Sequence, residues 1–444
     1  MFFQDNRKSL FMGLFFLSVS VLMVEIVSTR VAKILFGHTF QFLIFSLALL
    51  GIGIGSIAVY FFHSRIGGLR SSVLFRLSSL YLLFLILSFL SSHFKELLTS
   101  TPTKILFFIG LFILYFLYGV IVALFFASFR RSYSWLYFCL MAGSALGSFS
   151  IILLLDAFGI SKAILSLAAI TLLVLFFFGS FRRSELLIFF GFSLLLFFLL
   201  VFSPYVFDVT CGTSVSFNTE KYSGVDYLFS DSNSFSYVMV HDDPAGNAII
   251  IDCIGITRVY DLRPPSKKHA LLPLQDFPFY FRNYSSVLVL GSGGGIETAV
   301  AFLAGTDSIT AVEINPIVLG FVSDLVPAEG NIYAQRGVHL VNQEARNFVD
   351  STEDQYDLLF LGATKRYGGT GLREFMFLEN YLYTKQAFSS YLDRLHPDGI
   401  FFLRDVQGYS AKYLHTLLMT LQERGLDPLE HVIVVSTGTF GSFL

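Results

Sequence analysis

The sequence predicts a multi-pass α-helical membrane domain followed by an α/β domain built on a parallel sheet. The 444 residues are 54% hydrophobic and only 14% charged, with a mean hydropathy of +0.68, whereas about a quarter of the residues in a soluble domain are charged. Apolar residues dominate up to about residue 207, and charged residues return at ordinary frequency after it. A glycine-rich turn between two apolar, β-branched runs in the second half predicts the parallel sheet.

The first half contains stretches of the length that spans a bilayer, which is roughly 20 residues. They lie at about 10–35, 40–62, 73–94, 104–129, 134–157, 160–181 and 185–206. We therefore predict about seven transmembrane helices in residues 1–207. The first is too long for a signal peptide and is expected to stay as an anchor.

Basic residues between these stretches indicate the orientation. Alternate loops on one face carry Arg7 and Lys8, Arg65 and Arg70, Arg130 and Arg131, and Arg182 and Arg183. The positive-inside rule places this face on the cytoplasmic side of the membrane, which we expect to be a bacterial-type plasma membrane. An odd number of spans would then put the second half outside, which conflicts with a domain built for a cytosolic adenosine cofactor. The side that the second half faces stays open at this point.

Small residues four apart predict close helix packing within the membrane domain. They occur at Gly51 and Gly55, and again at Gly143 and Gly147. Ionisable residues near the end of the first stretch, such as Glu25, are interpreted as structurally paired rather than as transport groups.

The three cysteines, Cys139, Cys211 and Cys253, have no metal-ligand spacing, so no metal site is predicted. We interpret them as packing thiols. A Cys211–Cys253 disulfide would require an oxidising compartment. The net charge of −2 argues against a nucleic-acid partner.

The glycine-rich turn is the strongest functional motif. A buried strand at 287–290 precedes Gly291, Gly293, Gly294 and Gly295, and a helix at 296–303 follows with its N-terminus at the loop. The next apolar run, 309–312, ends at Glu313, placed to accept hydrogen bonds from ribose hydroxyls. We predict an adenosine-type ligand over these two strands. The alternative is a turn in which a helix merely packs close to a strand.

The remaining elements follow a βα alternation. A hairpin is expected at 234–240 and 247–251, a linker at 263–269, and strands at 338–341, 356–361, 400–403 and 431–435. Helices are expected at 379–395 and 409–424, and a seventh strand opens at 440–444, as if the domain were truncated there. Glu344 follows the third strand, near the base of a nucleoside or simply in a solvated loop.

With these motifs in view, the second half resembles the spermidine synthase-like branch of the class I S-adenosylmethionine-dependent methyltransferase fold, which is Rossmann-like. The whole chain looks like bacterial membrane-fused spermidine synthase-like proteins. The resemblance is carried by 25–30, 46–55, 290–295, 311–316, 344–346, 379–384 and 396–399. It implies a β-subdomain at 208–282 on a seven-stranded domain at 283–444. It also implies S-adenosylmethionine or its decarboxylated form as the ligand, bound by the glycine loop, Glu313, Ile314, Glu344 and Ala345.

The loop after the fourth strand departs from this pattern. The resemblance implies two carboxylates here, one deprotonating the attacking amine, but Gly362 and Lys365 stand in their places. Lys365 and Arg366 would repel a polyamine. Tyr367, Tyr381 and Tyr383 are weak candidates for a base, so the catalytic residues stay unknown.

The favoured function is therefore a membrane-anchored methyl- or other alkyl-group transferase rather than a true aminopropyltransferase. Its expected partners are the lipid bilayer and a small-molecule substrate, and self-association is left open. The main alternative is a transporter or membrane sensor with a non-catalytic nucleoside-binding domain. A third is a degenerate scaffold that binds no ligand.

Overall fold

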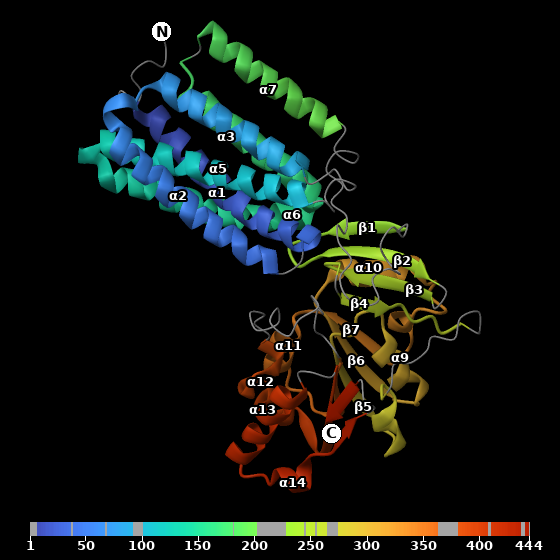
Figure 1. Cartoon of the computed structure of the whole chain (residues 1–444). Helices are drawn as coiled ribbons and strands as arrows, with labels where there is room; N and C mark the ends of the chain where they lie inside the picture. Colours follow the sequence, from blue (N-terminus) through green and yellow to red (C-terminus); the bar gives the residue numbers. More distant parts are fainter. Residues whose placement is uncertain are drawn as a thin grey trace. The chain divides into compact units, whose positions relative to one another are not determined.

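The computed structural model describes residues 7–36, 39–66, 69–91, 101–180, 182–201, 228–243, 246–253, 255–263, 274–362, 381–406, 410–436 and 440–443. The chain divides into two compact units (Figure 1). The helical unit comprises Met1–Ser223 with Ser232–Ser234, and the α/β unit comprises Gly224–Asp231 with Phe235–Leu444.

Six of the described helices in the helical unit are long and apolar enough to cross a membrane. They are α1 (Arg7–Phe36), α2 (Thr39–Ile66), α3 (Ser71–Ser91), α5 (Thr101–Ser128), α6 (Tyr133–Phe178) and α7 (Arg183–Val201), with the short 3₁₀ helix η1 (Arg130–Ser132) before α6. Their apolar surfaces lack any one-sided pattern, as expected for helices that are apolar all round.

The helix α6 is broken at Gly159, whose backbone is non-helical with φ 72° and ψ 179°. Before the break, the helix runs parallel to α1. A Cβ at Gly143 would lie 2.5 Å from the Phe15 carbonyl oxygen, and a Cβ at Gly147 would lie 2.5 Å from that of Val19. The contact moves by four residues along α6 and by four residues in the same direction along α1, so the two helices are parallel here.

After the break, the order of the contacts reverses. Ser9 Oγ donates to the Phe177 carbonyl at 2.8 Å, whereas Ser20 Oγ lies 2.9 Å from Thr171 Oγ1 further along α1. Later residues of α1 therefore meet earlier residues of α6. The chain turns back at Gly159, and α6 consists of two antiparallel segments, 133–158 and 160–178.

Glycines also bring α2 and α5 close together. A Cβ at Gly51 would lie 2.8 Å from Tyr115 Cβ, and one at Gly55 would overlap the Phe116 carbonyl oxygen. The prediction that these glycines serve close helix packing is thereby confirmed, because only a hydrogen atom fits between the two backbones. The same holds for Gly143 and Gly147 against α1.

The α/β unit begins with a four-stranded sheet in the order β1-β2-β3-β4. The strands are β1 (Phe229–Ser232), β2 (Tyr237–Asp243), β3 (Gly246–Ile251) and β4 (Gly255–Arg258). The predicted hairpin is confirmed, since β2 pairs antiparallel with β3 from Val238 opposite Ile251 to Asp243 opposite Gly246.

A seven-stranded sheet follows, in the order β10-β11-β9-β8-β5-β6-β7. Neighbours from β9 to β7 are parallel, and β11 is antiparallel to both β9 and β10. The strands are β5 (Ser286–Leu290), β6 (Ser308–Glu313), β7 (Val338–Asn342), β8 (Tyr356–Leu361), β9 (Leu395–Val406), β10 (Val434–Ser436) and β11 (Phe440–Phe443).

Helices lie against the two sheets (Figure 1). The helix α10 (Pro316–Leu325) packs on β2 and β3 of the small sheet. The other described helices of the unit are α9 (Ile296–Leu303), α11 (Ala345–Ser351), α12 (Lys385–Asp393), α13 (Ser410–Glu423) and α14 (Pro428–His431), with the 3₁₀ helices η3 (Phe277–Tyr280), η4 (Ile332–Ala334) and η6 (Tyr381–Tyr383).

Two predicted elements have different boundaries in the structure. The predicted helix 379–395 starts later, because Thr384 Oγ1 accepts a hydrogen bond from the Ala387 N–H and caps α12 there. It also ends earlier, since Leu395 already pairs with Tyr356 in the sheet. The predicted strand 431–435 begins at Val434, because Asp427 caps the short helix α14 before it.

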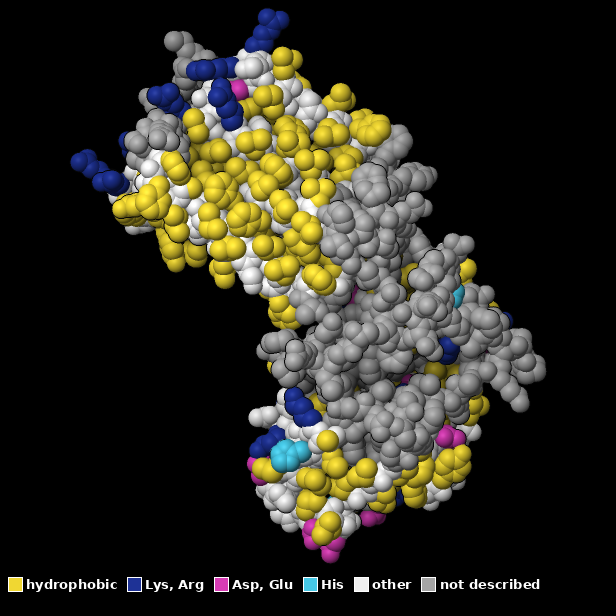
Figure 2. Space-filling model, viewed as in Figure 1, with side chains coloured by type: hydrophobic (Ala, Val, Ile, Leu, Met, Phe, Trp, Pro, Cys, Tyr) yellow, Lys and Arg dark blue, Asp and Glu magenta, His cyan; other side chains and the backbone are white. Residues whose placement is uncertain are grey.

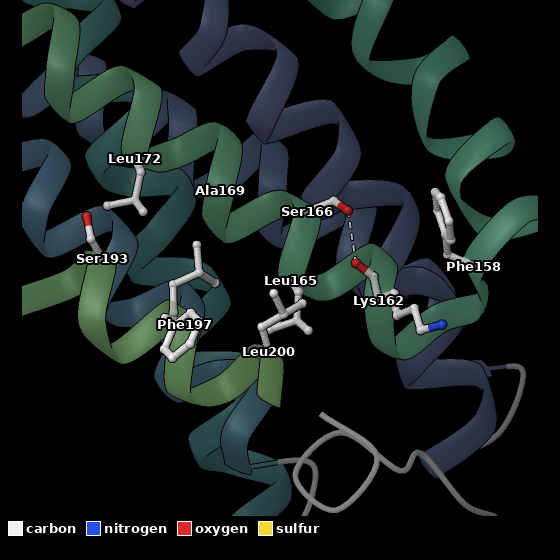
Figure 3. Close-up of a pocket in the computed structure, with 10 residues that line it drawn as sticks. Phe158, Lys162, Leu165, Ser166, Ala169, Leu172, Ser193, Phe197 and Leu200 are labelled. Carbon is white, nitrogen blue, oxygen red and sulfur yellow. Dashed lines mark hydrogen bonds between the residues drawn. The ribbon is translucent and has the colours of Figure 1, made fainter. Parts of the chain in front are cut away.

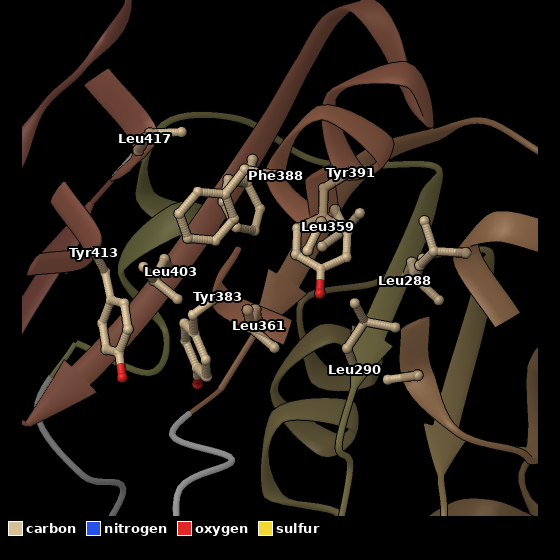
Figure 4. Close-up of a cluster of buried hydrophobic side chains, with 14 of the residues drawn as sticks. Leu288, Leu290, Leu359, Leu361, Tyr383, Phe388, Tyr391, Leu403, Tyr413 and Leu417 are labelled. Atoms are coloured by element: carbon tan, nitrogen blue, oxygen red, sulfur yellow. The ribbon is translucent and has the colours of Figure 1, made fainter. Parts of the chain in front are cut away.

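The core forms on both faces of the large sheet because successive strand residues point to opposite sides. One cluster combines Leu288, Leu290, Leu359, Leu361 and Leu403 with aromatic and aliphatic residues of η6, α12 and α13 (Figure 4). The other combines the alternate residues Val287, Val289, Leu358, Phe360 and Phe402 with Tyr284 and with Ala301 of α9. The carboxyl ends of the strands are thereby held in fixed register.

Candidate functional site

The carboxyl ends of the central strands place four polar or glycine positions along one sheet edge. Leu290 of β5 lies opposite Val312 of β6 on one side and Leu361 of β8 on the other. Leu361 in turn lies opposite Leu403 of β9. The residues that follow these positions are Gly291, Glu313, Gly362 and Arg404. Ligands of such sheets bind at this edge, where the strand order reverses between β5 and β8.

The glycine loop connects β5 to α9 through left-handed backbone. Gly291, Gly293 and Gly295 have φ values of 72°, 53° and 91°, a region that costs other residues free energy. The N–H groups of Gly291 and Ser292 both donate to the Val312 carbonyl, at 2.9 and 3.0 Å. This turn fixes the loop beside β6.

Strand β4 lies directly against the loop at Gly294. A Cβ at Gly294 would overlap the Arg258 carbonyl oxygen. The Gly294 N–H donates to Thr257 Oγ1 at 2.9 Å, and its carbonyl accepts from the Tyr260 N–H at 2.9 Å. The need for glycine at this position therefore comes from the protein's own backbone. The predicted alternative was a helix packed close to a strand, whereas here the strand β4 meets the loop. Ligand contacts by Gly291, Gly293, Gly294 and Gly295 stay predictions.

Glu313 is buried at the end of β6 and is held by two backbone donors. Its Oε2 accepts from the Gly293 N–H at 3.0 Å, and its Oε1 accepts from the Asn315 N–H at 2.9 Å. The carboxylate thus spans the glycine loop and the start of α10 in one orientation. Preorganised acceptors of this kind suit a ligand that carries vicinal hydroxyls.

The next residue, Ile314, is an exposed hydrophobic side chain at 36% accessibility. It lies between the carboxylate of Glu313 and the helix cap Asn315, whose Oδ1 accepts from the Ile317 N–H at 3.1 Å. A nucleoside site needs an apolar surface for the base and a hydrogen-bond acceptor for the ribose. Ile314 and Glu313 offer these two features side by side.

Glu344 and Ala345 start α11. The Glu344 side chain accepts from the Asn347 N–H at 2.8 Å and so acts as the N-cap of α11. This capping role accounts for a carboxylate at that position without any ligand. Ala345 is buried beneath it. The predicted ligand contacts of both residues stay predictions.

Arg346 brings two of the predicted motifs together. Its Nη1 donates to the Tyr381 carbonyl at 3.2 Å and to Thr384 Oγ1 at 3.0 Å. The segment 344–346 and the described part of the other motif, 381–384, are therefore neighbours although they are far apart in sequence.

The sequence analysis missed a buried ion pair at the point where the strand order reverses. Glu297 lies in the first turn of α9, and its Oε1 accepts from Arg404 Nη2 at 3.1 Å and from Gln275 Nε2 at 2.9 Å. The Arg404 side chain is only 4% exposed and that of Glu297 13%. A Cβ at Gly362 would lie 3.3 Å from the same Glu297 oxygen. A carboxylate therefore does stand beside Gly362, but α9 supplies it.

Tyr333 is a second residue that sequence reasoning missed. Its hydroxyl lies 2.7 Å from the Gly293 carbonyl and 2.9 Å from Ser292 Oγ. Burial raises the pKa of Tyr333, so the hydroxyl stays protonated and donates to the loop. No local sequence signal links residue 333 to a loop 40 residues earlier.

Of the tyrosines considered as a base, Tyr383 is buried and stacks on Tyr413 with ring centroids 4.3 Å apart. This contact gives it a structural role. Tyr381 is exposed. Lys365, Arg366 and Tyr367 lie outside the described residues, as does most of the predicted linker 263–269.

One of the described cysteines differs from the interpretation as packing thiols. Cys253 is disulfide-bonded, so its interpretation as a packing thiol was wrong. Cys139 is free and buried, as predicted, and Cys211 lies outside the described residues. Within the described part of the chain, no group of three or more His, Cys, Asp and Glu residues could hold a metal ion.

The helical unit has a groove of about 450 Å³ between α6, around and after its turn at Gly159, and α7 (Figure 3). Its walls are mainly apolar, with Lys162, Ser166 and Ser193 as polar residues among Phe158, Leu165, Ala169, Leu172, Leu196, Phe197 and Leu200. Such a groove suits an acyl chain or another apolar segment.

No protein-family model matches the chain. A polyamine aminopropyltransferase of Alkaliphilus oremlandii (strain OhILAs) is 26% identical over 134 residues, which cover 30% of this chain and 44% of that protein. One from Clostridium perfringens (strain SM101 / Type A) is 27% identical over 133 residues, with the same coverage of 30% and 44%. The chain thus spans less than half the length of these curated relatives.

Among solved structures, spermidine synthase from Thermotoga maritima shares 12% identity, with a TM-score of 0.35 over 49% of this chain and 70% of that one. The sequence similarity is the stronger finding. Together with the strand order described above, it identifies the α/β unit as a spermidine synthase-like domain with a methyltransferase-like fold.

Proposed function

We propose that the chain is a membrane-anchored transferase that binds S-adenosylmethionine or its decarboxylated form. The observation that carries this proposal is the Glu313 carboxylate, which is buried, fixed by the Gly293 and Asn315 N–H groups and placed at the end of β6. Ile314 next to it offers an apolar face for a base. The curated relatives act on polyamines, as their name says, and related chemistry would suit this chain.

We further propose that the transferred group is a methyl or other alkyl group rather than an aminopropyl group. Among the described residues, Glu297 places a carboxylate oxygen 3.3 Å from a Cβ at Gly362, and Arg404 neutralises this carboxylate at 3.1 Å. A neutralised carboxylate attracts a cationic polyamine weakly, because the guanidinium repels the ammonium groups at close range. The acceptor is therefore expected to be a neutral or anionic small molecule.

The apolar helices would anchor the protein in a bilayer. Each of the six is long enough to cross it, and the groove lined by α6 and α7 could admit an apolar acceptor from the lipid phase. These features support a hydrophobic acceptor.

Calorimetric titration of the full chain in detergent tests the ligand. Heat of binding is expected with S-adenosylmethionine or with the decarboxylated form, and absence of heat with both in a folded sample would refute the proposal. Glu313→Ala should weaken binding at least about tenfold, the equivalent of 1.4 kcal/mol. Glu329→Ala, which removes an exposed carboxylate, is the matched control and should bind normally.

The second candidate is a membrane sensor or transporter with a non-catalytic nucleoside site. The Glu297–Arg404 pair favours it, since a carboxylate held by a guanidinium is a poor base. This candidate predicts ligand binding without any loss of the methyl or aminopropyl group during prolonged incubation with lipid extracts and small-molecule acceptors, followed by mass spectrometry.

A further inference from the structure

We propose that the α/β unit lies on the extracytoplasmic face of the membrane. The inference rests on the membrane anchoring proposed above and goes beyond it, because anchoring alone leaves the side open. Three observations carry it: the directions of the helices, the position of the basic residues, and the disulfide at Cys253.

The contacts of α1 set the direction of three other segments. The first segment of α6 is parallel to α1 and the second is antiparallel, as shown above. The Ser18 hydroxyl oxygen lies 3.3 Å from that of Tyr118, and the Ser28 hydroxyl oxygen lies 3.5 Å from that of Tyr115. The later residue of α1 thus meets the earlier residue of α5, so α5 is antiparallel to α1.

Helices α2 and α3 complete the alternation. Along α2, Gly51 contacts an earlier part of α5 than Gly55 does. The helices α2 and α5 are therefore parallel. In α3, the Phe75 ring would lie 3.5 Å from a Cβ at Gly179. The Tyr81 hydroxyl oxygen lies 3.3 Å from the Ser20 hydroxyl oxygen of α1. Ser20 also contacts Thr171 in the second segment of α6. The earlier residue of α3 therefore lies beside the later part of that segment, so α3 is antiparallel to the segment and parallel to α1.

Helix α7 is the seventh pass. It begins at Arg183, five residues after α6 ends at Phe178. Its far end returns to the Gly159 turn, because Leu200 lines the same groove as Phe158 and Lys162 on either side of that turn (Figure 3). The chain therefore leaves α7 at the end of the bundle opposite to the start of α1.

The basic loops gather at the end where α1 begins. There the Phe11 and Phe129 rings lie 5.4 Å apart, next to Arg130 and Arg131. Ser9 reaches Phe177, which precedes Arg182 and Arg183. In Figure 2 the Lys and Arg side chains of the helical unit cluster at one end, while its sides are hydrophobic.

The opposite end is poorer in cations. Among the described residues, this end has Lys162, which follows the Gly159 turn in α6, and Arg30 and Lys33, which lie within α1. Basic loops remain in the cytoplasm during insertion. The first end is thus cytoplasmic, and the seven passes place the α/β unit on the other side.

The Cys253 disulfide points the same way independently of the helices. Cys253 lies in the turn between β3 and β4, where it and Asp252 adopt left-handed backbone with φ of 62° and 51°. Disulfides persist in oxidising compartments outside the cytoplasm and are rare within it. A domain that carries one is expected to face the outside.

Cysteine labelling of the full chain in bacterial cells tests the inference. Ser323→Cys introduces a thiol on exposed α10 of the α/β unit, and Ser184→Cys introduces one at the exposed, basic start of α7. A membrane-impermeant maleimide should label Ser323→Cys in intact cells with the outer envelope permeabilised. It should label Ser184→Cys only after the plasma membrane is opened. The unsubstituted chain gives the background.

Any other pattern overturns the inference: the reverse labelling, labelling of both positions in intact cells, or labelling of neither until the membrane is opened. The state of Cys253 gives a second readout. Without reductant it should resist alkylation in protein trapped rapidly from cells, and a freely alkylated Cys253 would count against the inference.

Failure of the underlying proposal looks different. If alkaline carbonate releases the protein from membranes, anchoring itself is refuted. If titration shows no adenosyl binding while the labelling result stands, the transferase proposal falls and the side of the domain is still established.

Discussion

The helical unit and the α/β unit both use glycine to let another segment approach the backbone closely, but under different constraints. In the helical unit, Gly55 sits in regular helix, and only the space against the Phe116 carbonyl requires it. In the glycine loop, Gly293 and Gly295 need both the space and a left-handed backbone. A glycine cluster therefore identifies close approach in either region, without telling whether a ligand or the protein itself approaches.

The two regions also bury polar groups differently. The helical unit pairs hydroxyls of α1 with tyrosines of its neighbours, as in Ser18 with Tyr118 and Ser20 with Tyr81. The α/β unit buries the charges of Glu297 and Arg404 together. Removing one hydroxyl from a pair costs about 1 kcal/mol, whereas an unpaired buried charge costs several.

The largest expected effect is therefore that of breaking the buried ion pair. Arg404→Met leaves the Glu297 carboxylate without its cation and should lower the free energy of unfolding by about 3–4 kcal/mol, measured by denaturant unfolding in detergent. The double variant Glu297→Gln/Arg404→Met should recover at least half of this loss. Equal losses in both variants would show that Arg404 acts by packing alone.

Gly294→Ala should come next. The new methyl group would overlap the Arg258 carbonyl, a main-chain atom that cannot rotate away, so a loss of about 3 kcal/mol is expected. Gly320→Ala in α10 is the matched control, because its Cβ would meet nothing within 4 Å. It should be neutral or stabilising by up to about 1 kcal/mol. Similar melting temperatures for the two variants would contradict the contact between β4 and the loop.

Within the helical unit, Gly55→Ala should cost about 2 kcal/mol by forcing α2 away from α5. Gly53→Ala, two residues away in the same helix, has open space around its Cβ and should cost nothing. Thermal denaturation of the full chain in one detergent compares the two directly. If both variants lose stability equally, glycine serves helix flexibility rather than close packing.

The smallest effect is expected at the amino end of the large sheet. Burial raises the pKa of Asp357, but hydrogen bonds from the Ser286 and Ser285 N–H groups outweigh it, and the pKa falls below its ordinary value of 3.8. The stabilisation is therefore present above pH 3.8 and is lost as the pH falls through the lower folded value. Asp357→Asn should cost about 1 kcal/mol at pH 7, reduced by solvent exposure.

The difference between Asp357→Asn and the unsubstituted chain should shrink steadily below pH 4 in unfolding experiments. A difference that is constant from pH 7 to pH 3 would show that the carboxylate charge is not the source. Replacing the exposed Asp324 by Asn controls for general loss of negative charge.

Much of the site followed from local sequence. The spacing between the glycine loop and Glu313 predicted that they would meet, because adjacent parallel strands end at one edge, and Glu313 does hold Gly293. The Glu297–Arg404 pair was not predictable, since its members are 107 positions apart. Each of them alone looks like an ordinary charged residue in a helix or a strand.

The sequence by itself determined the division into an apolar and a polar half, the hairpin, the glycine turn and the acidic strand end, because these depend on composition, period and short spacing. Only the tertiary structure decided that β4 fills the space beside Gly294 and that the chain reverses at Gly159. It also decided that α9 supplies the carboxylate beside Gly362. Each of these depends on segments far apart in sequence meeting within a few ångströms, which no local pattern encodes.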